Sequence, residues 1–338
     1  MSQISHDLRL NGQLGLDIAK ATFESCLLQG KRCYRRGFPN TCEGVRQLLG
    51  WLEKHASGPV VVALESTGRY GELVTSMLHE AGHQVSVVNA RWIKDHAKSQ
   101  GRRNKTDRSD AAIIADYACT HDMQPWSPPP AEKATLRALL HRIRELEAML
   151  QAERNRRECL PITSPLLQSL DRTSQALQEE IARIEKTLAE HIDSHPRIKA
   201  DCERLEAVPG IGPKSARWLI AELTHAFPNC RAAAAWVGVT PRLHESGTSV
   251  KKRLGTGPET NAALRSLLYL PAVVARNRNP ALKAFADRLQ SRGMSKKAVV
   301  LAVMHKLVRI AFALIKNQST YDPNYFPKAF SHLQNQPA

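Results

Sequence analysis

The sequence predicts an α/β domain followed by a mainly α-helical region, in a chain of 338 residues. Three observations support this. Strand and helix patterns alternate over the first 125 residues, a Pro-rich segment (QPWSPPPAE, 124–132) interrupts the chain, and helical apolar spacing dominates the remainder. The length suits two domains, because domains commonly span about 100 to 200 residues. The predicted divisions are an α/β domain (1–125), a helical or coiled-coil arm (126–198), a helical C-terminal domain (199–320) and a tail (321–338).

The elements of the first domain follow from apolar periodicity and from turn residues. The run PVVVALEST (59–67) is rich in β-branched residues and is typical of a strand buried on both faces. In chain order we expect a strand entering a hairpin (13–30), a helix (41–56), the buried strand, a helix closed by Gly82 (71–82), a strand (83–89) and a basic helical region. The early hairpin makes the expected sheet mixed.

The predicted arm carries two apolar stripes at helical spacing, interrupted by Pro161 and Pro165. The stripes are Leu136, Leu140, Ile143, Leu146 and Leu150, and then Leu177, Ile181, Ile184, Leu188 and Ile192. Their spacing fits both a helical hairpin and an intermolecular coiled coil.

Composition indicates a polyanionic partner. Lys and Arg number 48 against 32 Asp and Glu, a net charge of +16. No run of about 18 apolar residues and no signal-peptide core is visible, so we expect a soluble, cytoplasmic protein without membrane contact. The seven cysteines lack CxxC pairs and the 13 histidines are scattered, which indicates reduced thiols and no structural zinc.

Four carboxylates are candidates for one site. Asp107 and Asp110, in GRRNKTDRSDAAIIADYA (101–118), lie three residues apart and therefore on one side of a predicted helix. Asp17 lies in the first strand and Glu65 at the exit of the buried strand, and such strand ends can meet at one edge of a sheet. Each carboxylate also has an ordinary structural explanation. Asp107 and Asp110 could simply stabilise the start of a helix that Thr106 caps. Asp17 could close a turn, and Glu65 could be a solvated strand end.

A cluster of four carboxylates repels itself unless a multivalent cation neutralises it. Mg²⁺ prefers oxygen ligands and completes its shell from phosphates. Two such ions, about 3.5 to 4 Å apart, can stabilise both the attacking and the leaving oxygen of a phosphoryl transfer. The nearby Arg102, Arg103 and Lys105 would hold the strand that delivers the phosphate.

The segments GLDIAK, ALESTGRYG and VVNARWIKDHAKSQGRRNKTDRSDA are similar to the DEDD transposases of bacterial insertion sequences, of the IS-one-ten type, and to their Piv invertase relatives. The resemblance implies a RuvC-like (ribonuclease-H-like) N-terminal domain. It also implies that Asp17, Glu65, Asp107 and Asp110 are the catalytic metal ligands.

The segment LEAVPGIGPKSARWLIAEL (205–223) places a Pro-Gly-Ile-Gly turn between two helical stretches, which is a helix-hairpin-helix pattern. Backbone amides at such a turn can hold a DNA phosphate, so we predict contacts at Gly210, Gly212 and Lys214. A purely structural tight turn is the alternative.

The densest basic region lies between Arg242 and Lys297, with 12 Arg or Lys against three acidic residues. We expect a Gly- and Ser-rich loop followed by a helix, with Lys251, Lys252 and Arg253 as a DNA clamp. By the resemblance, HESG places the family's nucleophilic serine at Ser246. Asn261, Leu264 and Arg265 match its downstream N..LR element, and we predict a nucleic-acid contact at Arg265. Gly257 and Pro258 stand where many relatives have Ser and Lys.

Taken with the resemblance, these features predict a DNA recombinase or transposase of a bacterial insertion sequence. It would cut and rejoin DNA by serine attack assisted by Mg²⁺. The resemblance further implies a structured noncoding guide (bridge) RNA and a homo-oligomer, from dimer to tetramer. The alternatives are a site-specific invertase of the Piv type, a hydrolytic junction-resolving nuclease that uses water, and a binding-only protein.

Overall fold

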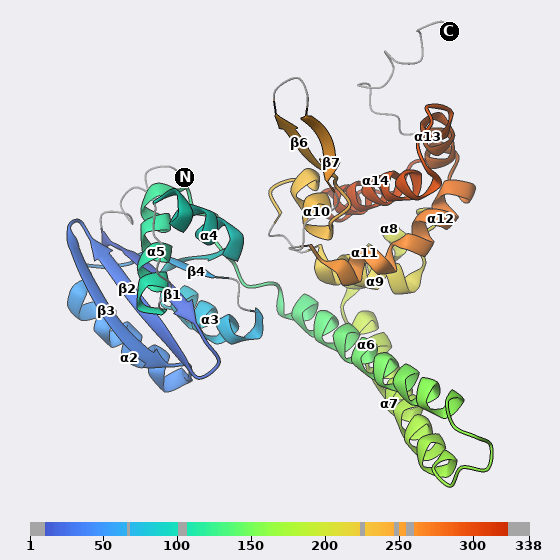
Figure 1. Cartoon of the computed structure of the whole chain (residues 1–338), viewed down its shortest axis with the longest axis horizontal. Helices are drawn as coiled ribbons and strands as arrows, with labels where there is room; N and C mark the ends of the chain where they lie inside the picture. Colours follow the sequence, from blue (N-terminus) through green and yellow to red (C-terminus); the bar gives the residue numbers. More distant parts are fainter. Residues whose placement is uncertain are drawn as a thin grey trace, which may run out of the picture. The chain divides into compact units, whose positions relative to one another are not determined.

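A computed structural model describes residues 11–65, 68–100, 107–223, 227–246, 250–254 and 260–323, with the backbone alone for 68–69, 107–109, 242–246 and 250–254. The chain divides into two compact units, Met1–Pro128 and Pro129–Ala338 (Figure 1).

The first unit contains a five-stranded sheet of order β3-β2-β1-β4-β5. Its strands are β1 (Gln13–Ile18), β2 (Thr22–Gln29), β3 (Arg32–Pro39), β4 (Val61–Glu65) and β5 (Gln84–Val88). The first three pair antiparallel, whereas β4 pairs parallel with both β1 and β5. The prediction of a mixed α/β sheet is confirmed, and this strand order is compatible with a RuvC-like fold.

Helices cover both faces of this sheet (Figure 1). One face packs on α2 (Cys42–His55) and on α3 (Glu72–Glu80), which follows the short 3-10 helix η1 (Gly68–Gly71). The other face packs on α5 (Asp107–Thr120), with α4 (Ala90–Ser99) beside it. The start of α4 is fixed by Asn89, whose side-chain oxygen accepts a hydrogen bond from the Arg91 amide at 2.8 Å.

The second unit is mainly helical, as predicted. It begins with α6 (Ala131–Glu158) and α7 (Leu167–Ser194), which lie side by side and antiparallel (Figure 1). The first predicted stripe is buried along α6, and Leu188 and Ile192 are buried on α7. The remaining helices are α8 (Pro196–Glu206), α9 (Pro213–Glu222), α10 (Cys230–Val237), α11 (Ala262–Leu267), α12 (Tyr269–Arg278), α13 (Pro280–Ser291) and α14 (Lys296–Asn317).

One expectation needs correction. Part of the predicted loop forms an antiparallel hairpin of β6 (Arg242–Ser246) and β7 (Val250–Leu254). By length and composition, α14 is the one helix of the described residues that could cross a membrane, although His305, Lys306 and Arg309 interrupt its apolar run. Its buried residues, such as Val303 and Leu307, instead form part of the core of the second unit.

Candidate active site

Asp17 and Glu65 lie next to each other at one edge of the sheet. The parallel register of β1 and β4 pairs Leu16 with Leu64, and each carboxylate is the next residue along its strand. Both residues are partly buried. The prediction that these two strand ends meet at one edge therefore agrees with the observed register.

The face of the sheet that carries these residues is the one covered by α5. Ala63 packs in a cluster with Ile113 and Ile114 of α5. A carbon atom added to Gly15 would lie 2.1 Å from the Ala111 carbonyl oxygen. Since alternate residues of a strand share a face, Asp17 follows Gly15 and Glu65 follows Ala63 on this same face.

The helix α5 runs antiparallel to β1, so its first turn lies toward Asp17. Near the helix end, the Cys119 thiol donates to Gln13 Oε1 at 3.1 Å, whereas Ala111 and Ala115 lie over Gly15. Asp17 lies two residues beyond Gly15, a distance of about 6.6 Å along the strand. A helix covers the same distance in about four to five residues. Four to five residues before Ala111 and Ala115, the first turn of α5 therefore lies opposite Asp17.

The two aspartates of α5 occupy different stripes of that helix. Asp107 stands four residues before Ala111, on the stripe nearest β1. Asp110 stands four residues before Ile114, whose stripe packs against β4. The backbone thus directs the Asp107 position toward the Asp17 strand and the Asp110 position toward the Glu65 strand.

The residues gathered here have the chemistry of a hard-cation site, because carboxylate oxygens are the ligands that Mg²⁺ prefers. The described side chains include Asp17, Glu65 and Asp110 but not that of Asp107, and among them no group of three His, Cys, Asp or Glu is close enough to hold a metal ion. The donor type and the strand-end placement fit a divalent metal. Ligation itself stays a prediction.

Other predicted contacts cannot be placed. Arg102, Arg103 and Lys105 lie outside the described residues, as do Gly257 and Pro258.

Ser246 is the last residue of β6, at the turn of the β6–β7 hairpin. It pairs with Val250, and His244 pairs with Lys252. Alternate and paired strand residues share a face, so positions 244, 246 and 252 lie on one face, and Lys251 and Arg253 on the other. His244 was not singled out from the sequence, although the alternation within HES could have indicated it.

Asn261 joins the start of α11 to α10, the helix before this hairpin, and this junction is called the hairpin base. Its backbone amide donates to the Trp236 carbonyl at 2.9 Å, and its side-chain oxygen accepts from the Leu264 amide at 2.9 Å, which caps α11. Arg265 donates to Thr260 Oγ1 at 2.8 Å beside it. Asn261 and Arg265 therefore contribute to the structure of the hairpin base, and DNA contact by Arg265 stays a prediction.

Glu222 connects this base to α6 and was missed by sequence reasoning. Its side chain is 1% exposed. Asn261 Nδ2 donates to one oxygen at 3.1 Å, and Arg137 Nε donates to the other at 3.2 Å. His141 Nε2 lies 3.0 Å from that second oxygen. Only the fold could identify this network, because its members are 39 to 85 residues from Glu222 in sequence.

The two glycines of the turn before α9 differ. Gly210 has φ +108°, and an added carbon would lie 2.5 Å from Ala275 Cβ, so the fold itself requires glycine there. Gly212 has φ −97° and open space where a side chain would be. It immediately precedes α9, which begins at Pro213, so the first backbone N–H groups of that helix belong to Lys214 and Ser215. Lys214 Nζ donates to Glu147 at 2.6 Å in an exposed ion pair.

Comparison with known proteins adds independent information. A family model described as a transposase, of the DEDD type, matches residues 14–165. A second, described as the transposase IS116/IS110/IS902 family, matches residues 202–287. The chain is 30% identical over 314 residues to the pilin gene-inverting protein of Moraxella bovis, covering 91% of this chain and 97% of that protein. It is 27% identical over 347 residues to the transposase for insertion sequence element IS1111A of Coxiella burnetii, covering 91% and 90%.

Proposed function

The chain belongs to the IS110 family of transposases and DNA-inverting recombinases, and on that basis we propose that Ser246, together with Mg²⁺ held by Asp17, Glu65, Asp107 and Asp110, cuts and rejoins DNA. The metal-binding role of the four carboxylates is supported by one observation: Asp17 and Glu65 lie side by side on the face of the sheet that α5 covers. When bound there, Mg²⁺ would neutralise phosphate charge and stabilise the attacking and leaving oxygens.

The serine step follows the usual course of nucleophilic catalysis. Ser246 Oγ attacks the phosphorus of a DNA phosphodiester, a serine O–P bond forms, and the bond to one sugar oxygen breaks. The serine proton passes to a base, and the departing sugar oxygen gains a proton to become a hydroxyl group. The hydroxyl of another strand then attacks the phosphoserine and releases Ser246, so the number of phosphodiester bonds is conserved.

His244 is the base that we propose. It stands two residues before Ser246 on the same hairpin face, about 6.6 Å away along the strand. Histidine side chains in general can gain or lose a proton near physiological pH, so a neutral imidazole can take the serine proton. The paired Lys252 position on that face would favour an approaching phosphate.

We further propose that the second unit binds DNA phosphates at two places. The open position before α9 supports one contact, through the first amides of that helix. The Lys251 to Arg253 segment supports another, since it carries three positive charges on a hairpin. The guide RNA and the homo-oligomer also belong to this proposal. The family supports both, and the net charge of +16 supports the RNA partner.

Inversion is the second candidate, because the Moraxella relatives are named for inverting a pilin gene. A hydrolytic, junction-resolving nuclease is the alternative chemistry. A plasmid assay separates them when the native flanking sequences and any adjacent noncoding RNA are supplied with Mg²⁺. Excision or insertion of the element supports transposition, inversion of the segment between sites supports an invertase, and nicked or linear DNA without new junctions would overturn recombination.

A further inference from the structure

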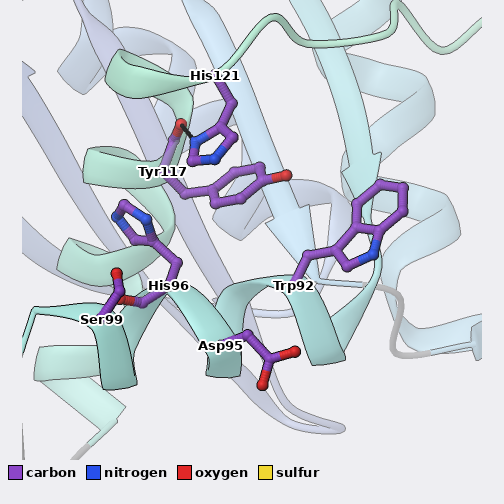
Figure 2. A pocket seen from close by; sticks show the side chains of 6 residues that line it. All are labelled: Trp92, Asp95, His96, Ser99, Tyr117 and His121. Carbon is purple, nitrogen blue, oxygen red and sulfur yellow. Dashed lines mark hydrogen bonds between the residues drawn. The ribbon is translucent and has the colours of Figure 1, made fainter. Parts of the chain in front are cut away.

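A pocket of about 530 Å³ lies between α4 and α5, apart from the carboxylates. Figure 2 shows its lining, in which α4 contributes Trp92, Asp95, His96 and Ser99, and α5 and the residue after it contribute Tyr117 and His121. The volume falls within the range of small-ligand sites, about 300 to 1,000 Å³. It is therefore large enough for a nucleobase with part of its sugar.

Trp92 is an exposed aromatic residue at this pocket. It is 58% exposed, whereas Trp51 and Trp218 are 7% and 4% exposed in the cores of their units. Core packing therefore does not account for an indole in this position. In Figure 2 the Tyr117 hydroxyl points toward the side of the pocket where Trp92 stands.

The opposite wall is an ordered group of rings. Tyr117 and His121 stack with centroids 4.0 Å apart and planes 9° apart, and His96 meets Tyr117 edge-on at 5.4 Å. His96 Nε2 lies 2.8 Å from Asp116 Oδ2, which fixes the imidazole plane. The pocket thus has one exposed aromatic surface, Trp92, facing a wall whose rings hold each other in place.

Charged side chains of α4 lie beside the pocket. Asp95 pairs with Arg91 at 3.4 Å and with Lys98 at 3.6 Å, and all three side chains are at least half exposed. These cations can approach a nucleic-acid backbone, while ring nitrogens and carboxylates can bond to the edge of a base.

The Trp92 end of the pocket is the part that follows the sheet edge of the acidic residues, whereas Tyr117 and His121 lie at the far end of α5. The register of β4 and β5 pairs Glu65 with Val88, and α4 begins two residues later at Ala90. Trp92 is therefore four residues from the strand partner of Glu65. A nucleic-acid strand whose phosphate lies beside Glu65 can place a neighbouring nucleotide near Trp92.

We propose that this pocket binds an unstacked nucleobase of the nucleic-acid strand at the acidic site, with Trp92 as the stacking surface; this rests on the proposed function. Stacking on aromatic side chains tolerates any base, because every base has a π face. Moving a base out of its stack into a pocket costs least where the strand is already single.

The test uses the full chain carrying Ser246→Ala and short single strands with one 2-aminopurine, as DNA and as RNA of the same sequence. Stacking quenches 2-aminopurine fluorescence, so we expect quenching at saturation. Trp92→Ala should abolish the quenching and weaken binding about 5- to 150-fold, the range for losing one stacked base. Trp92→Phe should retain both. Lys94→Ala, an exposed charge change on the same helix, should weaken binding without changing the quenching at saturation.

Quenching in the DNA arm alone would identify a substrate strand, and in the RNA arm alone a guide strand. Unchanged quenching and affinity in Trp92→Ala would overturn the proposal. Trp92 is exposed, so loss of folding does not confuse the result. A parallel assay for covalent protein–DNA adduct in the Ser246 parent separates the two hypotheses. An adduct without Trp92-dependent quenching refutes the pocket alone, and Trp92-dependent quenching without an adduct refutes the serine chemistry alone.

Discussion

Gly15 and Ala111 meet so closely that a side-chain carbon at position 15 would lie 2.1 Å from the Ala111 carbonyl oxygen and 2.3 Å from the Ala115 amide nitrogen. Only glycine allows α5 to rest directly on β1 at this point. The contact fixes the height of α5 above the sheet. It therefore fixes where the Asp107 and Asp110 positions stand relative to Asp17.

Gly15→Ala should lift α5 from the sheet. We expect a loss of about 1 to 3 kcal/mol in unfolding free energy from overpacking. DNA cleavage should fall about 10²-fold, because a displacement of about 1 Å in a catalytic group has that effect. Thermal melting and a cleavage time course check both values. Gly50→Ala is the control, since nothing lies near its added carbon and alanine favours a helix. Full activity in Gly15→Ala would mean that the height of α5 does not matter.

Asp110→Asn should abolish cleavage and leave DNA affinity nearly unchanged, because it removes a hard-cation ligand while keeping the shape. Melting should barely change, since lower repulsion among the carboxylates offsets the weaker helix start. The exposed pair-forming Glu43 supplies a remote control as Glu43→Gln. Cleavage in EDTA, or a fully active Asp110→Asn protein, would refute the metal assignment.

Apolar patterning predicted most of the first unit but not β3 (Arg32–Pro39), whose residues are mainly exposed and basic. The strand Val61–Glu65 is apolar up to its last residue, and such a run is typical of a central strand buried on both faces. The β6–β7 hairpin was missed because its residues are polar and basic and its pairing lacks an apolar face that periodicity can detect. The sequence marked the four acidic positions, whereas the role of Gly15 depends on a helix that begins about 90 residues later.

The second unit shows a different limit. Glu222 lies in an apolar helical stretch, and its partners come from α6 and from the start of α11. No local pattern indicates which distant cation will meet a buried carboxylate. Similarly, the sequence alone does not distinguish Gly210 from Gly212. The positive φ of Gly210 and its contact with Ala275 show that the fold requires glycine at 210 and not at 212.

That difference gives a paired prediction. Gly210→Ala should lower the melting temperature markedly, because the left-handed φ and the Ala275 contact both oppose a side chain. Gly212→Ala should leave melting within about 0.5 kcal/mol of the parent. It should nevertheless weaken DNA binding if a phosphate approaches the amides of α9, and a salt titration of affinity would report this. Unchanged affinity in Gly212→Ala would mean that this turn is structural only.

Glu222→Gln should loosen the hairpin base. The variant removes the buried charge and weakens its hydrogen bonds, whereas Arg137 and His141 are 50% and 38% exposed and stay solvated, so we expect a loss of about 1 to 3 kcal/mol. We expect lower melting and slower recombination than in the parent. Glu147→Gln breaks an exposed ion pair with Lys214 and should change stability by about 0 to 1 kcal/mol. Equal melting of both variants would refute the role of Glu222.

The identity of the nucleophile is the central claim, and trapping a covalent intermediate tests it most directly. The purified protein is incubated with Mg²⁺ and target DNA whose nick lets the released strand diffuse away, so that the reverse attack has no partner. The parent should accumulate protein joined to DNA through Ser246, and mass spectrometry of the digested adduct should locate the phosphate on that residue. Ser246→Ala should bind the same DNA and form no adduct. Mg²⁺-dependent cleavage by Ser246→Ala at the parent's rate, with no adduct in either protein, would contradict serine catalysis and favour a nuclease that uses water.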